Sequence, residues 1–578
     1  MQLVQLFVSA CALLPSTLLI GATFPCAVAV VARGIGRIGE DVGYVYGANT
    51  LGAIAGAAAG GFVIMPALGV HGALVVAAAA NLALATLLLA ARAGWRRPQW
   101  IAAVATGLIA FGALRLPQWD QGVMSSGPAI YARTYRAVGD ELGRQLRLQT
   151  VLFYRDGLSS TVSVHRSADN VFLRVNGKTD ASTGTDMPTQ LLLGHLPLLA
   201  HPEPQSVLII GMGSGVTAGA VARHPVRRID VVEIEPAVVE ASRFFTHVNN
   251  DVLTDPRVNV VIADGRNFLL TTSERYDVII SEPSNPWIAG LASLFSREFF
   301  ELARNRLKPG GLMLQWVQAY SLPTDDLRMV IRTLRSVLPA VSVWRSTKVD
   351  LLLLGGAEPT SIEPARLAQR YAEHPGLRSD LQLIGVRHGA AVAGYLALSE
   401  RDTVGFAEGA GRNTDDRLPL EFSAPRALYL DTLGPNLAAL AAARQATPPP
   451  ALEEALDRAG GADVRYALGS LALARKDADE ARRHFERALT LDPGHVPSAL
   501  ELADLAYQGG QWSPALRLAR QALAREASNA RGHFLAGVAS AALFETSEAL
   551  RFLRRAVDLE PGNVEYRRAL GRIPGGDR

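Results

Sequence analysis

A short apolar run followed by closely spaced glycines constrains the fold of this chain more than any other feature. Residues 207–210 read Val-Leu-Ile-Ile, and Gly211, Gly213 and Gly215 follow before an alanine-rich stretch. Such glycines let the backbone turn sharply, and they leave the N–H groups of the next helix facing a ligand. The order of strand, glycine turn and helix predicts the first unit of an open, largely parallel α/β sheet.

Further apolar segments continue this pattern, and acidic residues stand at or after their ends. The segments cover residues 229–235, 258–262 and 276–280. The residues at their ends are Glu233 and Glu235, then Asp264 with Gly265, then Glu282. Because the carboxyl ends of parallel strands share one edge, these carboxylates are expected to meet at the glycine turn. Glu233 follows the first glycine by about 20 residues, the spacing of an acid that binds ribose hydroxyls, and Glu235 is the second candidate.

A purely structural alternative is a flavodoxin-like sheet. In that case the glycines only permit tight packing and the acids are solvated. The convergence of acids after several strands favours the ligand-binding interpretation over this one.

Together with residues 172–177 and 195–198, these motifs resemble the spermidine synthase-like aminopropyltransferases. The resemblance is closest to bacterial membrane proteins in which such a domain is fused to transporter-like helices, and it covers residues 151–318 in detail. It implies a Rossmann-like fold with a small β unit before it, and a site for decarboxylated S-adenosylmethionine or S-adenosylmethionine. The implied contacts are the three glycines against the sulfonium tail, Glu233 on the ribose, and Asp264 with Gly265 beside the adenine.

The implied acceptor site departs from the usual family pattern. Two aspartates three residues apart usually follow the fourth strand, and Glu282 and Asn285 stand at the matching positions. Asp186 and Gln190 likewise fall within an altered motif ahead of the first core strand. A diamine needs several carboxylates, to balance its charge and to take a proton from the attacking nitrogen. Glu282 is the expected catalytic residue, with Asp186, Gln190 and Asn285 as expected substrate contacts. Acids that would partly compensate are Asp180, Asp415 and Asp416.

The N-terminal region predicts membrane helices. Charged side chains are absent from residues 1–32, 42–91 and 98–114. Helices of membrane-spanning length are expected near 3–31, 43–65, 70–91 and 99–115. The first basic residue is Arg33, so the first helix is not expected to be a cleaved signal peptide. Membrane lipid is therefore an expected partner, in the inner membrane.

Two arguments give opposite answers about the side of the membrane on which the soluble domains lie. Arg33, Arg37, Arg92, Arg96 and Arg97 mark the loops that they occupy as cytoplasmic, which with four helices places the rest of the chain outside. An adenosyl cofactor made in the cytosol requires the opposite, and a short fourth segment that lies on the surface would remove the conflict. We expect the soluble domains in the cytoplasm.

The C-terminal part repeats with a period of 34 residues. Ala481, Ala515 and Ala549 are separated by this period. It is typical of tetratricopeptide repeats, in which small residues let paired helices pack closely and the concave face binds a peptide or protein. The alternative is that the array is only a packing appendage.

Composition excludes some other classes of function. A net charge of +3 gives no support to nucleic-acid binding. Both cysteines, Cys11 and Cys26, lie in the apolar region, so neither a disulfide framework nor a cysteine-rich metal site is expected. No metal is needed for the implied reaction.

The sequence therefore predicts a multi-domain protein. Its parts are transmembrane α-helices at 1–116, a connector at 117–150, a β unit with a helix at 151–200, a Rossmann-like domain at 201–440, a proline-rich linker at 441–460, and an all-α tetratricopeptide solenoid at 461–570.

The expected activity is transfer of an aminopropyl group from decarboxylated S-adenosylmethionine to a small amine. Methyl transfer from S-adenosylmethionine is one alternative, because Ser214 replaces an aspartate that aminopropyltransferases often carry. A catalytically silent ligand-binding or scaffold module is another.

Overall fold

A computed structural model describes residues 2–32, 34–91, 97–113, 119–360, 362–444 and 450–576. The chain divides into two compact units. The first contains Met1–Met124 with Tyr154–Thr161, and the second contains Ser125–Phe153 with Val162–Arg578.

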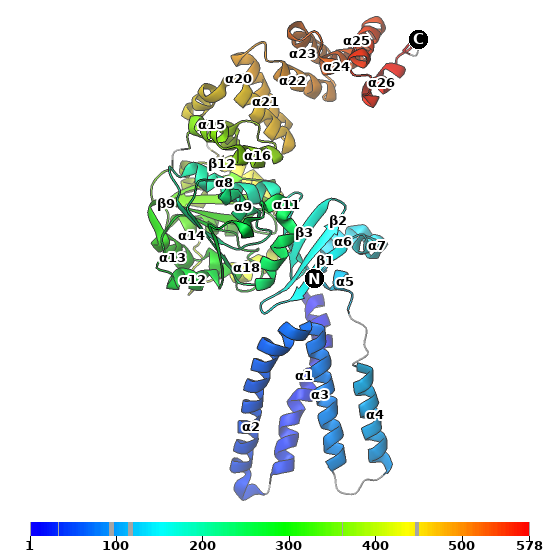
Figure 1. Ribbon diagram of the computed structural model, residues 1–578, viewed down its shortest axis with the longest axis vertical. Coiled ribbons are helices and arrows are strands. Elements are labelled where there is room, and N and C mark those ends of the chain that lie inside the picture. Colours follow the sequence, from blue (N-terminus) through cyan, green and yellow to red (C-terminus); the bar gives the residue numbers. More distant parts are fainter. Residues whose placement is uncertain are drawn as a thin grey trace. The chain divides into compact units, whose positions relative to one another are not determined.

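The first unit is built from long apolar helices (Figure 1). They are α1 Gln2–Val31, α2 Ile38–Ala59, α3 Met65–Ala91 and α4 Arg97–Ala113, with a π-helical turn at Gly60–Ile64. Helices therefore occur at all the places where the sequence predicts membrane spans. Within the described part of this region, two stretches, Leu6–Val31 and Ile35–Leu88, are long and apolar enough to cross a membrane by length and composition. The predicted loop residues Arg33, Arg92 and Arg96 lie outside the described residues.

The connector and the β unit follow. Short helices occupy α5 Gln121–Met124, α6 Ala132–Val138 and α7 Leu142–Arg147. An antiparallel sheet in the order β1-β2-β3-β4 comprises β1 Thr150–Asp156, β2 Thr161–Ser167, β3 Asn170–Val175 and β4 Lys178–Ser182. The hairpin β3–β4 closes on Asn176 and Gly177, whose φ values of 50° and 79° are those of a tight two-residue turn.

The central sheet has the strand order β12-β10-β11-β9-β8-β5-β6-β7. Its strands are β5 Ser206–Ile210, β6 Arg228–Glu233, β7 Val258–Ile262, β8 Tyr276–Ser281, β9 Leu307–Gln318, β10 Ala340–Arg345, β11 Asp350–Gly356 and β12 Leu396–Leu398. Strands β5 to β9 are parallel, and β10 to β12 are antiparallel. The chain passes from β5 outward to β7 and then returns to the other side of β5 as β8. Ligands of open α/β sheets bind at such a switch point.

Helices cover both faces of this sheet (Figure 1). Alternate residues of β5 point to opposite faces, with Val207 and Ile209 in one core and Leu208 and Ile210 in the other. The first core includes residues of α8 Met187–Ala200, α9 Val216–Ala222 and α10 Pro236–Ala241. The second includes residues of α12 Gly265–Thr271, α13 Arg297–Arg306 and α14 Thr324–Arg335. The remaining helices of the domain are α11 Thr246–Asn249, α15 Pro364–Glu373, α16 Pro375–Leu383, α17 Glu400–Ala407, α18 Pro419–Ala427 and α19 Leu433–Ala443.

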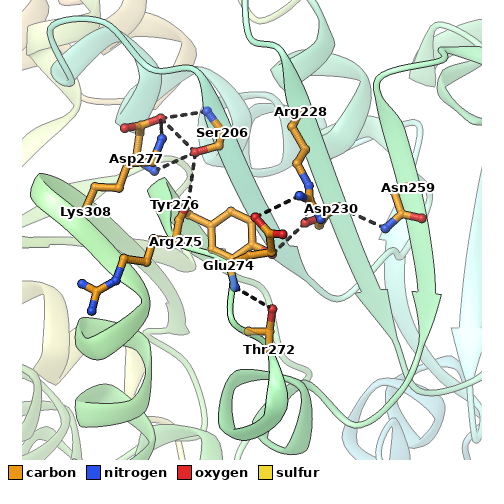
Figure 2. Close-up of polar contacts among 10 residues, drawn as sticks. All are labelled: Ser206, Arg228, Asp230, Asn259, Thr272, Glu274, Arg275, Tyr276, Asp277 and Lys308. Atoms are coloured by element: carbon orange, nitrogen blue, oxygen red, sulfur yellow. Dashed lines mark hydrogen bonds and ion pairs between the residues drawn. The ribbon is translucent and has the colours of Figure 1, made fainter.

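Two buried aspartates hold the strand starts together, at the edge away from the glycine turn (Figure 2). Asp230 of β6 accepts a 2.7 Å hydrogen bond from the hydroxyl of Tyr276 on β8. Asp277 of β8 accepts from the backbone N–H of Ser206 on β5 at 2.8 Å and from Nζ of Lys308 on β9 at 2.9 Å. These contacts fix β5, β6, β8 and β9 relative to one another, and thereby position their opposite ends.

The C-terminal array consists of α20 Pro450–Ala474, which is kinked at Gly460, followed by regular helix pairs (Figure 1). They are α21 Ala478–Leu491, α22 Val496–Gln508, α23 Trp512–Arg525, α24 Ala530–Ala542, α25 Thr546–Leu559 and α26 Val564–Gly571. The period-related Ala481, Ala515 and Ala549 are all fully buried. Of the predicted linker, 445–449 lie outside the described residues, and helix α20 has already begun at Pro450.

Candidate active site

The glycine turn joins β5 to α9 in a conformation that requires glycine. Gly211, Gly213 and Gly215 have φ values of 100°, 51° and 81°, a region that side chains with a Cβ rarely adopt. A Cβ on Gly211 would lie 2.7 Å from the backbone oxygen of Glu282. The turn after β5 therefore touches the loop after β8, as the switch point requires.

Glu233, at the end of β6, lies against this turn. Its carboxylate accepts hydrogen bonds from the backbone N–H groups of Met212 and Glu235, both at 2.9 Å. Burial raises the pKa of Glu233, and these backbone donors oppose the rise. The second candidate, Glu235, is used elsewhere, because its side chain caps α10 by accepting from the N–H of Ala237 at 3.2 Å. Glu233 is thus the acid of this strand end that faces the glycine turn.

Asp264 follows β7 and begins α12. Its carboxylate accepts from the N–H of Asn267 at 2.8 Å, a normal N-cap interaction. The adjacent Gly265 packs tightly, since a Cβ there would lie 2.5 Å from Cγ2 of Ile210 on β5. The structure therefore fixes Asp264 beside the end of β5, on the side of β6 and β7.

Glu282 follows β8 and is the most strongly perturbed acid at this edge. Its Oε2 accepts a 2.8 Å hydrogen bond from the hydroxyl of Thr217 on α9. Burial is the main reason that its pKa is raised from 4.5 to about 8, although Thr217 lowers it. The neighbouring carboxylates that raise it further are Asp350, Asp180 and Asp186.

Those neighbours come from three separate elements. Asp350 begins β11 and is held by the hydroxyl of Thr189 at 2.8 Å and the indole of Trp316 at 3.2 Å. Asp186 precedes α8. Burial raises the pKa of both carboxyls, and in each case hydroxyl donors oppose the rise. The site thus gathers buried acids from separate elements, and such groups are candidates for binding a cation.

A buried lysine stands on the β4 side of the same cluster. Lys178 forms an ion pair with Asp180, and the side chain of Ser284 donates a 2.7 Å hydrogen bond to the same aspartate oxygen. Burial alone would lower the pKa of Lys178, but Asp180 and Tyr320 raise it above its ordinary value, so the ammonium is charged. The β3–β4 hairpin therefore brings Asp180, with its bound lysine, into contact with the loop after β8.

Gln190 and Asn285, two of the predicted substrate contacts, lie within this region and differ in their hydrogen bonding. Gln190 is buried, and its amide donates to the backbone oxygen of Ser182 at 2.9 Å and contacts the hydroxyl of Ser214. Asn285 is fully buried and donates to the hydroxyl of Tyr320 at 3.3 Å, but its side-chain oxygen has no hydrogen-bond partner among the described residues. Trp287 packs edge-on against Tyr320 with a centroid distance of 5.7 Å.

Asp415 lies away from the acid cluster. It is paired with Arg266 of α12, and this side-chain hydrogen bond lowers the pKa of Asp415. Among the residues that the structure describes, no group of three or more His, Cys, Asp or Glu side chains is arranged to hold a metal ion.

Sequence reasoning missed several residues of this edge. Thr217, Lys178, Asp350 and Tyr320 were not among the candidates. The Asn176-Gly177 pair was the available signal for Lys178, because this dipeptide predicts a hairpin whose second strand begins at the lysine. Asp350 had no comparable local signal, since its partner Thr189 is far away in the sequence.

Two family models match parts of this chain. The family model described as the spermine/spermidine synthase domain matches residues 187–348, and a tetratricopeptide repeat model matches residues 472–539. The chain contains a spermidine synthase domain. A tetratricopeptide repeat region follows this spermidine synthase domain, and both were expected from the sequence.

Individual relatives match only the central part. Putrescine N-methyltransferase 2 of Nicotiana tabacum is 33% identical over 195 residues, which are 33% of this chain and 55% of that protein. Polyamine aminopropyltransferase of Thermococcus onnurineus is 37% identical over 170 residues, which are 29% of this chain and 58% of that protein. The chain thus spans somewhat more than half the length of these relatives. The crystal structure of spermidine synthase from Thermotoga maritima is 23% identical, with a TM-score of 0.34, and the match covers 39% of this chain and 78% of that one.

Proposed function

We propose that this protein is a membrane-anchored transferase that moves an aminopropyl group from decarboxylated S-adenosylmethionine to an amine. The observation that carries the proposal is the acid cluster of Glu282, Asp186 and Asp350, which lies at the same sheet edge as the predicted adenosyl site. Burial is the main cause that raises the pKa of each of these carboxyls, and an ammonium substrate bound beside them would favour their ionised forms.

The residues at the predicted cofactor site offer the groups that an adenosyl sulfonium would contact. The glycine turn exposes backbone close to the switch point, Glu233 offers carboxylate oxygens beside it, and Asp264 stands at the next strand end. In the reaction, the amine nitrogen would form a bond to the carbon next to sulfur, and the carbon–sulfur bond would break with its electrons passing to sulfur. This chain's contribution is to hold both reactants in line and to accept the proton.

Glu282 is the proposed acceptor of that proton. Its raised pKa makes it mostly protonated in the free protein at neutral pH. Binding of an ammonium group beside it would favour the ionised form, and the carboxylate would then receive a proton from the same nitrogen. The hydroxyl of Thr217 orients Oε2 through its 2.8 Å hydrogen bond.

Methyl transfer from S-adenosylmethionine is the second candidate, and a specific contact favours it. Ser214 of the glycine turn contacts the neutral amide of Gln190, so no carboxylate of the turn repels the carboxyl group of S-adenosylmethionine. Relatives named putrescine N-methyltransferases also match the central part. The third candidate is a silent scaffold that binds the ligand without turnover.

Calorimetry on the full-length protein in detergent distinguishes the two enzyme candidates. Decarboxylated S-adenosylmethionine and S-adenosylmethionine are titrated in parallel into the wild type and Asp264→Asn, which keeps an N-cap acceptor but removes the charge. Glu274→Gln, at the opposite sheet edge (Figure 2), is the matched control. Tighter binding of the decarboxylated compound that weakens only in Asp264→Asn supports aminopropyl transfer. Tighter binding of S-adenosylmethionine supports methyl transfer, and binding of neither compound refutes both enzyme proposals.

Membrane insertion and the repeat partner are separate parts of the proposal. The two long apolar stretches support an inner-membrane anchor, and we place the soluble domains in the cytoplasm, where the adenosyl compound is made. Protease protection in sealed vesicles of either orientation tests this placement.

The tetratricopeptide region is proposed to bind a protein or peptide segment in its concave face. Crosslinking from that face in intact cells, compared with a chain truncated after residue 460, tests it.

A further inference from the structure

We infer that a cleft between the spermidine synthase domain and the first helices of the C-terminal array binds a small organic phosphate, in which a phosphate group is attached to an apolar or aromatic body. The inference goes beyond the proposed function and does not depend on it. None of the residues that line this cleft belongs to the acid cluster or to the glycine turn.

The cleft is large, and its two walls are packed against one another elsewhere. Its volume is about 960 Å³, which is within the range of small-molecule sites. One wall comes from β10, β12 and the start of α17, and the other comes from α20 and α21. Leu456 and Leu468 of α20 belong to the same hydrophobic core as Tyr371 of α15. The array is therefore fixed to the domain where the cleft lies.

Part of the lining is apolar and remains accessible. Ile362, Leu396 of β12 and Leu452 of α20 border the cleft, and each is only partly buried. β12 is the last strand on its side of the sheet, so no further strand covers it. An apolar or aromatic group in the cleft would remove this surface from water, which favours binding.

Three arginines from separate elements border the cleft with their guanidinium groups unpaired. They are Arg401 of α17, Arg444 after α19 and Arg483 of α21. None of these guanidinium groups forms a hydrogen bond or an ion pair with a residue that the structure describes. A guanidinium presents its N–H donors in a planar fork that fits the oxygens of a phosphate. The cleft thus offers donors for an anion from several directions.

Most acids of the cleft already have partners within the protein. These pairs are Glu453 with Arg465, Asp402 with the hydroxyl of Ser399, and Glu400 with the N–H of Thr360. The remaining acid of the lining, Glu480, has an oxygen 4.0 Å from Nε2 of His484. In the described lining, unpaired guanidinium groups therefore outnumber unpaired carboxylates.

His484 shows that this positive charge is concentrated at one place. Burial lowers its pKa to about 4, and the further causes are the charges of Arg465, Arg483, Arg444 and Arg475. Its ring is neutral at physiological pH and can donate one N–H to a phosphate.

Arg475 adds a buried charge behind the wall of the cleft. Its Nη1 donates to the backbone oxygen of Gly394, a residue of the lining, at 2.8 Å. Its Nε and Nη2 are buried without hydrogen-bond partners among the described residues. Burying a cation in this state is costly, and an anion in the cleft would reduce the cost.

The test uses two compounds that separate charge from apolar surface. Naphthyl phosphate carries a phosphate on an aromatic ring system, and inorganic phosphate carries the charge alone. Each is titrated by calorimetry into the full-length protein in detergent, and a titration into detergent alone is subtracted. The wild type is expected to bind naphthyl phosphate at least about tenfold more tightly than inorganic phosphate, because only the former buries apolar surface.

Arginine variants assign the binding to this cleft. Arg444→Gln and Arg483→Gln each remove one charged donor, and each is expected to weaken the binding of naphthyl phosphate about tenfold. An unchanged melting temperature without ligand checks that both variants are folded. Arg517→Gln is the matched control, because Arg517 follows Arg483 by one period of 34 residues and does not border the cleft. It is expected to bind as the wild type does.

The contrary results are equally definite. Failure of naphthyl phosphate to bind, or equal binding to the wild type and to both cleft variants, would overturn the inference. Equal weakening in Arg517→Gln would also overturn it, since the binding would then reflect only the general charge of the array. Inorganic phosphate that binds as tightly as naphthyl phosphate would refute the part of the inference that concerns the apolar body. The proposed transfer reaction is tested with adenosyl compounds and would stand after any of these results.

Discussion

Glu282 titrates in a way that makes the stability of the central domain depend on pH. In the folded protein its carboxyl holds a proton up to a pKa of about 8, whereas its ordinary value is 4.5. Between these values the folded state binds one more proton than the unfolded state, so the contribution of Glu282 to stability is greatest below pH 4.5 and is lost as the pH rises towards 8. Glu282→Gln keeps the shape of the protonated side chain and removes this titration.

The expected size follows from the number of protons involved. One proton changes the free energy of unfolding by about 1.4 kcal/mol per pH unit, so from about pH 5.5 to about pH 7.5 the wild type is expected to lose about 2–3 kcal/mol relative to Glu282→Gln. Urea unfolding of both full-length proteins, followed by tryptophan fluorescence at several pH values, measures this difference. The membrane and repeat regions are identical in the two proteins, so their contributions cancel.

A difference that does not grow with pH would refute the reasoning. It would mean that Glu282 ionises in the folded protein as it does in the unfolded chain, and that the acids at the sheet edge do not lie as close together as the structure places them. Glu408→Gln, an exposed glutamate at the end of α17, controls for the loss of one surface carboxylate. If transfer requires ionised Glu282, kcat/KM is also expected to rise with pH up to about 8.

Other substitutions test the adenosyl side of the site and the repeats. Gly265→Ala would place a Cβ 2.5 Å from Ile210, so it is expected to displace the start of α12 and weaken adenosyl binding, as measured by calorimetry. Glu233→Gln loses a charged acceptor of the Met212 N–H and is expected to cost about 1–3 kcal/mol in urea unfolding as well as adenosyl affinity; unchanged binding would contradict its proposed role. Gly537→Ala would place a Cβ 2.6 Å from a leucine of α25 and is expected to cost about 1–3 kcal/mol, and a melting transition of the repeats equal to that of the wild type would show that this packing is loose.

Local patterns in the sequence were sufficient for much of the fold. Apolar runs of strand length with acids at their ends predict both the strands and the edge at which Glu233, Asp264 and Glu282 lie, because parallel strands all end at the same side. The period of 34 residues predicts the helix pairs, since each repeat packs only on its neighbours. These inferences need only relations between residues close together in the chain or separated by a fixed period.

Only the tertiary structure determines which charged side chains lie close together. Asp350 joins the acid cluster because β11 pairs with β9, and Lys178 reaches it because the β3–β4 hairpin brings Asp180 within hydrogen-bonding distance of Ser284. The perturbation of Glu282 depends on both of these placements and on burial. The sequence by itself determined the strand ends and the residue types found there. How those residues are charged was decided by contacts between distant segments, because electrostatic interactions depend on distance and burial in the folded chain and not on position along it.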